Sequence, residues 1–135
     1  RTYADELGIG PGDLEGEVAA PTTRGYADFL LRTAALGDYL ELVAALLPCM
    51  WGFAEVGARL ATERQPADQR YRAWIATYAS AEFRDLAAWC RELLDRLAAG
   101  APPAALAAAE RAFVTSSRYE LAFWQMAWDM ETWPG

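Results

Sequence analysis

Histidine is missing from this sequence of 135 residues. Without it, the segment cannot supply a proximal haem ligand, a Glu-x-x-His motif for a di-iron centre, or the base of a Ser-His or Cys-His dyad. Any catalysis by these residues must therefore use cysteine, glutamate, aspartate or tyrosine. A haem or di-iron enzyme would need metal ligands from outside this segment.

Cysteine is scarce, because the chain carries only Cys49 and Cys90. The pair has neither the CxxC spacing nor the clustered spacing of a metal site, and two thiols do not make a disulfide framework. We therefore expect no metal and no bound cofactor. The cytoplasm is the default expectation for such a chain.

An excess of positive charge and long apolar runs are also lacking. The formal net charge is −7 and the arginines are scattered, whereas proteins that bind nucleic acid need clustered Lys and Arg. No apolar run reaches the roughly 20 residues that span a bilayer. A basic-then-apolar signal peptide is not visible, although a truncated start would hide one. We expect neither a nucleic-acid partner nor a membrane span.

What the sequence does contain is much apolar surface, with 54% hydrophobic and 13% aromatic residues. The length fits one modest domain, residues 1–135. A chain this short lacks the interior volume for so much apolar surface, so we expect some of it to contact another chain or a missing segment. Residues 1–7 resemble the end of a helix already under way, which favours an absent N-terminal part.

The pattern of apolar residues and helix signals predicts an all-α bundle, because no strand-like alternation of useful length occurs. Residues 8–21, rich in Gly, Pro and acids, are predicted to form a loop. Start and stop signals then predict five helices. The first runs from a cap at Thr22 or Thr23 to Gly37, and the second from Asp38, which forms a capping box with Glu41, to about Arg64. The third runs from about Asp68 to Ala79. The fourth runs from a cap at Ser80 to Ala99, and the fifth from Pro103 to about Glu131.

The second of these helices carries a cysteine directly after a proline, Pro48-Cys49. This helix is apolar nearly all round, so we expect it in the middle of the bundle. Proline in a helix interior costs roughly 3 kcal/mol, which a chain tolerates where a kink is useful. The local sequence leaves two interpretations open: Cys49 is a small core side chain, or Pro48 directs a functional thiol.

Glu120 lies on the predicted core side of the last helix, about 200° around it from Arg118 on the wet face. Its helical neighbours are Ser116, Ser117, Phe123 and Trp124. Desolvation would raise the pKa of a carboxyl group placed there, which suits a general acid. A core glutamate paired with an arginine or capped by Ser116 is the alternative. Tyr26 and Tyr78 face inward on their helices and fit either core packing or a site.

Three sequence blocks, in this order and spacing, resemble those of thiaminase II, the TenA-type aminopyrimidine aminohydrolases. They are residues 46–57 (LLPCMWGFAEVG), residues 74–80 (WIATYAS) and residues 116–124, in which SSRYE and FW carry the match. Residues 26–31 (YADFLL) agree upstream. The resemblance covers essentially the whole chain. It implies a haem-oxygenase-like multi-helix bundle, used without haem and assembled as a homotetramer.

The resemblance also implies an activity and a set of site residues. The family hydrolyses the aminomethyl group of 4-amino-5-aminomethyl-2-methylpyrimidine, which gives the hydroxymethylpyrimidine of thiamine salvage, and it also cleaves thiamine. Carried over by motif, Cys49 is the nucleophile and Glu120 the acid/base. Tyr26 and Tyr78 would contact or orient the pyrimidine, and Phe123 would pack on its ring.

The chain departs from the family pattern at two places. Phe53 stands where the family usually has tyrosine, so its ring still packs at the substrate site while the hydroxyl near the thiol is gone. The family also draws an aspartate and an aromatic residue from an N-terminal helical segment, to which no part of this chain corresponds. Two hypotheses remain: an N-terminally truncated aminopyrimidine hydrolase, and a catalytically inactive helical binding or assembly module of the same fold.

Overall fold

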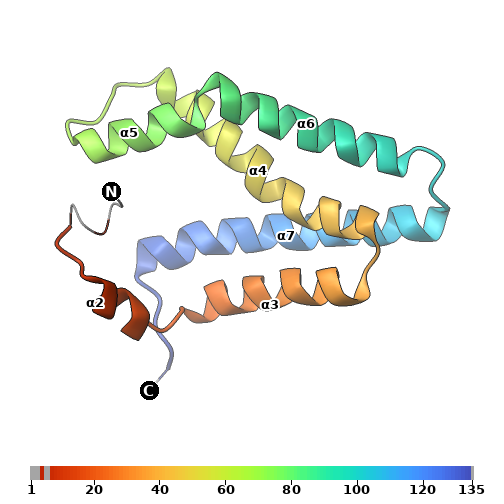
Figure 1. The fold of residues 1–135 in the computed structure, drawn as a ribbon, viewed down its shortest axis with the longest axis horizontal. Helices are drawn as coiled ribbons and strands as arrows, with labels where there is room; N and C mark the ends of the chain where they lie inside the picture. The colour runs from red at the N-terminus through yellow and green to blue at the C-terminus, as the bar shows by residue number, and fades with distance from the viewer. Residues whose placement is uncertain (1–3, 5–6, 135) are drawn as a thin grey trace.

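The computed structural model describes Ala4 and residues 7–134, which form a bundle of helices (Figure 1). The helices are α2 (Pro11–Gly16), α3 (Pro21–Leu36), α4 (Tyr39–Ala61), α5 (Gln69–Tyr78), α6 (Ala81–Ala98) and α7 (Pro103–Asp129). No strand occurs among the described residues. The all-α prediction is confirmed, and the five predicted helices correspond to α3–α7. The helix end predicted for residues 1–7 lies largely outside the described residues.

Helix α4 lies in the middle of the bundle, as its apolar faces predict, and packs against α3, α5, α6 and α7 (Figure 1). The Asp38 carboxylate begins it by accepting a hydrogen bond from the Glu41 backbone N–H at 2.8 Å, which confirms the predicted cap. The helix continues through Pro48 without a break. Because proline has no N–H, the Ala44 carbonyl loses its usual helical donor there.

A short helix, α2, lies inside the stretch 8–21 that was expected to be loop throughout. Pro11 occupies its first position, where a missing N–H costs nothing. The Asp13 carboxylate accepts a hydrogen bond from the Gly10 backbone N–H at 2.9 Å. Local start signals therefore suffice for one and a half turns of helix in a segment whose composition favours loop.

The start of α3 corrects the predicted cap at Thr22 or Thr23, because the helix begins at Pro21 with Ala20 as its cap position, two or three residues earlier, and no side chain caps it. The free Thr22 backbone N–H instead donates to Glu131 at 2.9 Å, and the Thr22 hydroxyl donates to the same carboxylate at 3.2 Å. Beside them, the Trp133 indole N–H donates to the Ala19 carbonyl at 2.9 Å. We call this group of Ala19, Thr22, Glu131 and Trp133 the C-terminal clasp.

Two helices end earlier than predicted. Helix α4 ends at Ala61 rather than near Arg64, because the Thr62 hydroxyl and the Gln65 amide donate to carbonyls of its last turn at 2.8 and 3.1 Å. Helix α7 ends at Asp129 rather than Glu131, because Met130 adopts a left-handed conformation with φ of 53°. In both cases the signal that ends the helix is local geometry that composition does not reveal.

Helix α6 follows its predicted bounds closely. The Ser80 hydroxyl accepts a hydrogen bond from the Phe83 backbone N–H at 3.1 Å, as its predicted cap requires. The helix ends at Ala98, one residue before the predicted Ala99, and Gly100 takes a left-handed φ of 84° that glycine adopts without strain.

Helix α4 is also long and apolar enough, at 23 residues, to cross a bilayer by length and composition alone. The prediction that no apolar segment reaches this length is therefore wrong for α4. In the structure, 44% of its most apolar window is buried, and a helix at the centre of a bundle passes the same test. Its packing against four other helices accounts for its apolar character.

Large apolar side chains remain on the surface, as the composition predicted. The exposed fraction is 68% for Leu31, 45% for Leu46, 72% for Leu121 and 85% for Trp128. The expectation that another chain or segment covers such surface stays a prediction.

Candidate active site

Cys49 lies near the middle of α4 and is half-buried. Burial raises the pKa of its thiol to about 11, and the charge of Glu120 and a hydrogen bond to it add to this effect. Because a carboxylate can only accept, Cys49 donates its S–H proton to Glu120. The structure thus brings together, from α4 and α7, the two residues that the sequence predicted as nucleophile and acid/base.

The Glu120 carboxylate has a second donor in Tyr26, from α3. The Tyr26 hydroxyl donates to Glu120 Oε1 at 2.7 Å, and the same hydroxyl lies 2.7 Å from Ser116 Oγ. Ser116 is fully buried and Tyr26 nearly so. Burial, together with the Glu120 carboxylate, raises the pKa of Tyr26 well above its ordinary value. Tyr26 therefore stays a neutral phenol and a hydrogen-bond donor across the physiological range.

The Tyr26 ring is held by a stack of aromatic side chains between α3 and α7. Tyr119 lies parallel to Tyr26, with ring centroids 5.2 Å apart and an angle of 4° between the planes. Phe29, one turn further along α3, packs on the same Tyr119 ring at 5.6 Å. Offset stacking of this kind fixes the plane of a ring, so Tyr26 presents its hydroxyl to Glu120 in one orientation.

A separate aromatic cluster holds Phe53 and Tyr78, two predicted substrate contacts. Their ring centroids lie 4.9 Å apart, and the Phe53 ring also packs on Trp74 at 6.0 Å and Trp124 at 5.2 Å. Phe53 follows Cys49 by one turn of α4, so the cluster lies next to the thiol along the helix. At this position the Phe53 ring packs on its aromatic neighbours and carries no hydrogen-bond donor.

Glycine allows α4 and α5 to approach closely enough for this cluster to form. A methyl group at Gly57 would lie 2.6 Å from the carbonyl carbon of Tyr78 and 2.7 Å from its Cβ. Gly57 is itself buried in the contact between the two helices. The position of Tyr78 therefore depends on the absence of a side chain at Gly57.

Phe123, the remaining predicted contact, follows Glu120 by about one turn of α7 and is partly buried. Its ring meets Trp124 edge-on, with centroids 6.4 Å apart. Through Trp124 it joins the Phe53 cluster. The predicted site residues therefore form two neighbouring groups: Cys49, Glu120 and Tyr26 as the polar group, and Phe53, Tyr78 and Phe123 as the aromatic group.

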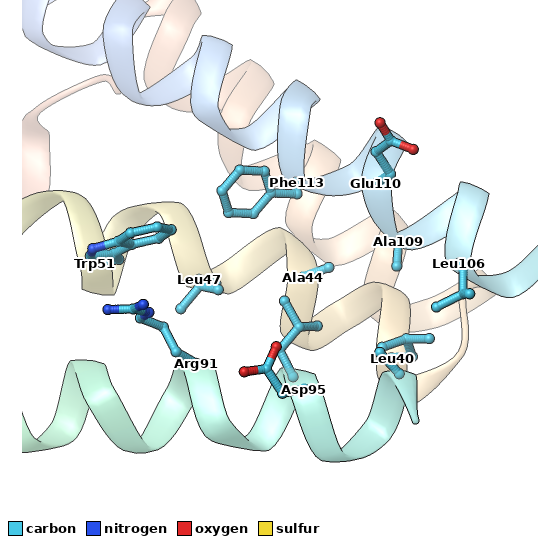
Figure 2. A pocket seen from close by; sticks show the side chains of 12 residues that line it. Leu40, Ala44, Leu47, Trp51, Arg91, Asp95, Leu106, Ala109, Glu110 and Phe113 are labelled. Carbon is cyan, nitrogen blue, oxygen red and sulfur yellow. The ribbon is translucent and has the colours of Figure 1, made fainter. Parts of the chain in front are cut away.

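The opposite side of α4 lines a cavity of about 410 Å³ that contains neither Cys49 nor Glu120 (Figure 2). Leu40, Ala44, Leu47 and Trp51 face it from α4, about 170° around the helix from Cys49. Ala109 and Phe113 face it from α7. At one end the Arg91 guanidinium of α6 lies over the Trp51 ring, 4.5 Å from its centroid.

The sequence predicts Ser116 as a neighbour or cap of Glu120 but not as a partner of Tyr26, and it gives Tyr119 only as part of the SSRYE block, with no packing role. Adjacent serines look alike in a sequence, and only the register between α3 and α7 decides which one meets Tyr26. Among the described residues, no group of three or more Cys, Asp or Glu side chains is placed to hold a metal ion.

Known proteins similar to this chain include two aminopyrimidine aminohydrolases and a TenA homologue of solved structure. The chain is 40% identical to an aminopyrimidine aminohydrolase of Halalkalibacterium halodurans, over 98% of this chain and 60% of that protein. It is 34% identical to the aminopyrimidine aminohydrolase of Bacillus subtilis, over 98% of this chain and 56% of that one. The fold matches the TenA homologue from P. horikoshii OT3 with a TM-score of 0.81 at 33% identity, over 93% of this chain and 57% of that one.

The chain therefore spans 56–60% of the length of these relatives. Its helices nevertheless follow the haem-oxygenase-like fold of the TenA homologues throughout, as the sequence predicted. The profile of the TENA/THI-4/PQQC family matches residues 1–130. On the fold, the sequence identity and this match together, the chain belongs to the TENA/THI-4/PQQC family.

Proposed function

We propose that this chain forms the nucleophile-bearing part of an aminopyrimidine hydrolase, with Cys49 as nucleophile and Glu120 as acid/base. One observation carries the proposal: a thiol from α4 and a carboxylate from α7 share a hydrogen bond, and Tyr26 from a third helix orients the carboxylate. The names of the relatives supply the substrate class. Since the chain spans only part of their length, the activity belongs to the full-length protein.

The chemistry requires both residues. An aminopyrimidine resists direct displacement at its exocyclic carbon. Addition of the Cys49 sulfur to a ring carbon, with Glu120 protonating a ring nitrogen, removes the aromaticity, and the electron pair of the 4-amino group then expels the protonated amine as ammonia. Water adds to the exocyclic carbon, the C–S bond breaks and the ring regains its aromaticity. The balance is aminomethylpyrimidine plus water to hydroxymethylpyrimidine plus ammonia.

The raised pKa of Cys49 assigns the first proton transfer to Glu120. With a pKa of about 11, only about one thiol in ten thousand is ionised at pH 7. A standing thiolate therefore does not carry the reaction, and the proton must leave as the sulfur attacks. Glu120 already accepts the hydrogen bond from the thiol, so it takes this proton and then returns it to the ring nitrogen as the acid.

The aromatic group fits the ring of the substrate. We assign Phe53, Tyr78 and Phe123 to bind the pyrimidine, because flat aromatic faces bind a planar heterocycle by stacking. Tyr26 takes a different role from a direct ring contact, because its hydroxyl is already bound to Glu120. We assign it to orient the acid/base. The substrate we propose is 4-amino-5-aminomethyl-2-methylpyrimidine, with thiamine as a second substrate, in a cytoplasmic homotetramer.

Replacing Cys49 tests the proposal. In the full-length protein, Cys49→Ala is expected to lower kcat/KM for ammonia release from the aminopyrimidine by more than about a thousandfold, because the covalent route is lost. Cys90→Ala is the matched control: Cys90 is half-buried on α6, and its loss should leave the rate unchanged. Full activity in Cys49→Ala would remove the nucleophile assignment.

A second candidate function is a binding module that holds the pyrimidine without converting it. Two observations favour it: Phe53 lacks the hydroxyl that the family usually places near the thiol, and burial keeps Cys49 protonated. This candidate predicts saturable binding of the aminopyrimidine by calorimetry with no release of ammonia. Turnover that depends on Cys49 would eliminate it.

A further inference from the structure

Ser116 differs from the other serine and threonine hydroxyl groups that lie beyond the first turn of a helix and have a described hydrogen bond. Thr33, Thr77 and Ser117 each donate to the carbonyl oxygen four residues earlier in their own helix, at 2.8–2.9 Å. Such internal bonds are the common fate of a hydroxyl inside a helix. Ser116 instead points across to α3, where its Oγ lies 2.7 Å from the Tyr26 hydroxyl. It is also completely buried, so water cannot replace this partner.

The direction of the hydrogen bonds follows from counting protons. Tyr26 has one hydroxyl proton, and an ionised carboxylate can only accept. The Tyr26 proton is therefore directed to Glu120 Oε1 at 2.7 Å. Its oxygen is left to accept, so the proton between Ser116 and Tyr26 comes from Ser116. The hydrogen bonds form one directed chain, from Ser116 through Tyr26 to Glu120.

We propose that Ser116 is a positioning residue for the acid/base Glu120, acting through the Tyr26 hydroxyl. Donation from Ser116 polarises the Tyr26 O–H group and so strengthens its hydrogen bond to the carboxylate. It also fixes the Tyr26 hydroxyl rotor, because the tyrosine oxygen accepts from Ser116 while its proton bonds to Glu120. The Glu120 carboxylate is thereby held in one orientation beside Cys49. This inference rests on the proposed function for its catalytic meaning, whereas the chain of hydrogen bonds stands without it.

The titratable groups that face Glu120 come from two helices. Tyr26 lies against it from α3 and Cys49 from α4. Ser116, one turn earlier on α7, does not titrate, so its removal changes no charge. A change in the pH profile caused by loss of Ser116 is therefore expected to be transmitted through the hydrogen bond to Tyr26.

A set of variants of the full-length protein, all carrying Cys90→Ala, tests the proposal. The variants are Ser116→Ala, Ser117→Ala, Tyr26→Phe and the double variant of Tyr26→Phe with Ser116→Ala. The first readout is the acidic limb of the pH profile of kcat/KM for ammonia release. The second is the inflection in the rate at which iodoacetamide alkylates Cys49 as the pH is varied. The second readout needs no substrate turnover.

The expected shifts differ in size. Loss of a direct hydrogen bond to an ionised carboxylate raises its pKa, so Tyr26→Phe should move the limb up by about one to two pH units. Ser116→Ala acts indirectly, through Tyr26, and should move the acidic limb up by about half a pH unit. Ser117→Ala should not move the acidic limb, because the Ser117 hydroxyl donates its hydrogen bond to the Phe113 carbonyl instead. In the Tyr26→Phe background, Ser116→Ala should add nothing.

Two results would overturn the proposal. One is a Ser116→Ala profile that coincides with that of Ser117→Ala. The other is a Ser116→Ala shift of the same size with and without Tyr26, which would show that Ser116 acts by general packing. If the starting protein releases no ammonia, the proposed function fails, and the alkylation inflection alone then decides on Ser116.

Discussion

The two sides of α4 are built differently, although both are apolar in sequence. On one side Cys49 meets a polar group in which Tyr26 holds Ser116 and Glu120 at 2.7 Å each. On the other side small residues such as Ala44 and Ala109 leave a cavity of about 410 Å³ (Figure 2). Hydrogen bonds fix both distance and direction, whereas apolar contact is non-directional. One side of the helix can therefore hold reacting atoms in place, while the other side supports the fold through apolar packing that leaves a cavity unfilled.

The largest effect should come from the polar side. Glu120→Gln keeps an acceptor for the Tyr26 hydroxyl but cannot take a proton, so kcat/KM should fall by about a hundredfold to ten-thousandfold. Burial is the main cause of the raised pKa of Cys49, and the substitution removes the Glu120 charge that raises it further. That pKa should therefore move down toward 9, and alkylation of Cys49 near pH 8 should become faster. Slower alkylation with unchanged turnover would break the assignment of chemistry to this side.

The contact between α4 and α5 should show the next largest effect. Gly57→Ala forces a methyl group to within 2.6 Å of the Tyr78 backbone, and such overpacking should lower the free energy of unfolding by about 1–3 kcal/mol. Displacement of Tyr78 should also raise KM for the pyrimidine. Urea unfolding and steady-state kinetics measure both.

The control for that variant lies on the same helix. Gly52→Ala meets no atom within 4 Å, so it should stabilise the protein by about 0.5–1 kcal/mol through the better helix propensity of alanine. Equal effects of the two substitutions would mean that α5 does not depend on a close approach at Gly57.

The smallest effect should come from the cavity side. Ala109→Leu adds apolar volume to the cavity without touching the polar group, and cavity filling of this kind should raise the free energy of unfolding by about 1 kcal/mol. The pH profile and kcat should stay unchanged. Ala107→Leu, at an exposed position of the same helix, should bring no such gain. A change in kcat with Ala109→Leu would show that the two sides of α4 are coupled.

The helices themselves could be predicted because their signals are local. Asp38 and Ser80 each precede a helix by one residue and cap it as predicted. The cap of α3 could not be predicted, because its acceptor, Glu131, lies 109 residues away in sequence from Thr22. No local pattern announces such a partner.

The candidate site likewise has one feature that local sequence signals predict and one that they do not. Helical periodicity alone placed Glu120 on the inner side of the last helix, and the structure agrees, with Tyr26 and Cys49 against it. The choice of Ser116 over Ser117 as the partner of Tyr26 depends on the relative rotation and register of two helices. Periodicity gives the face of one helix and says nothing about the register between two.

The C-terminal clasp gives the pair α3 and α7 a second point of attachment. The two helices run antiparallel and are pinned near one end by Glu131 on Thr22, and about one turn of α3 further on by Tyr26 on Glu120. Two hydrogen-bonded attachments between the same two helices prevent them from sliding along each other, which a single attachment would still allow. The residues that follow α7 therefore help to hold Tyr26 level with Glu120, because they fix the position of α3 along α7.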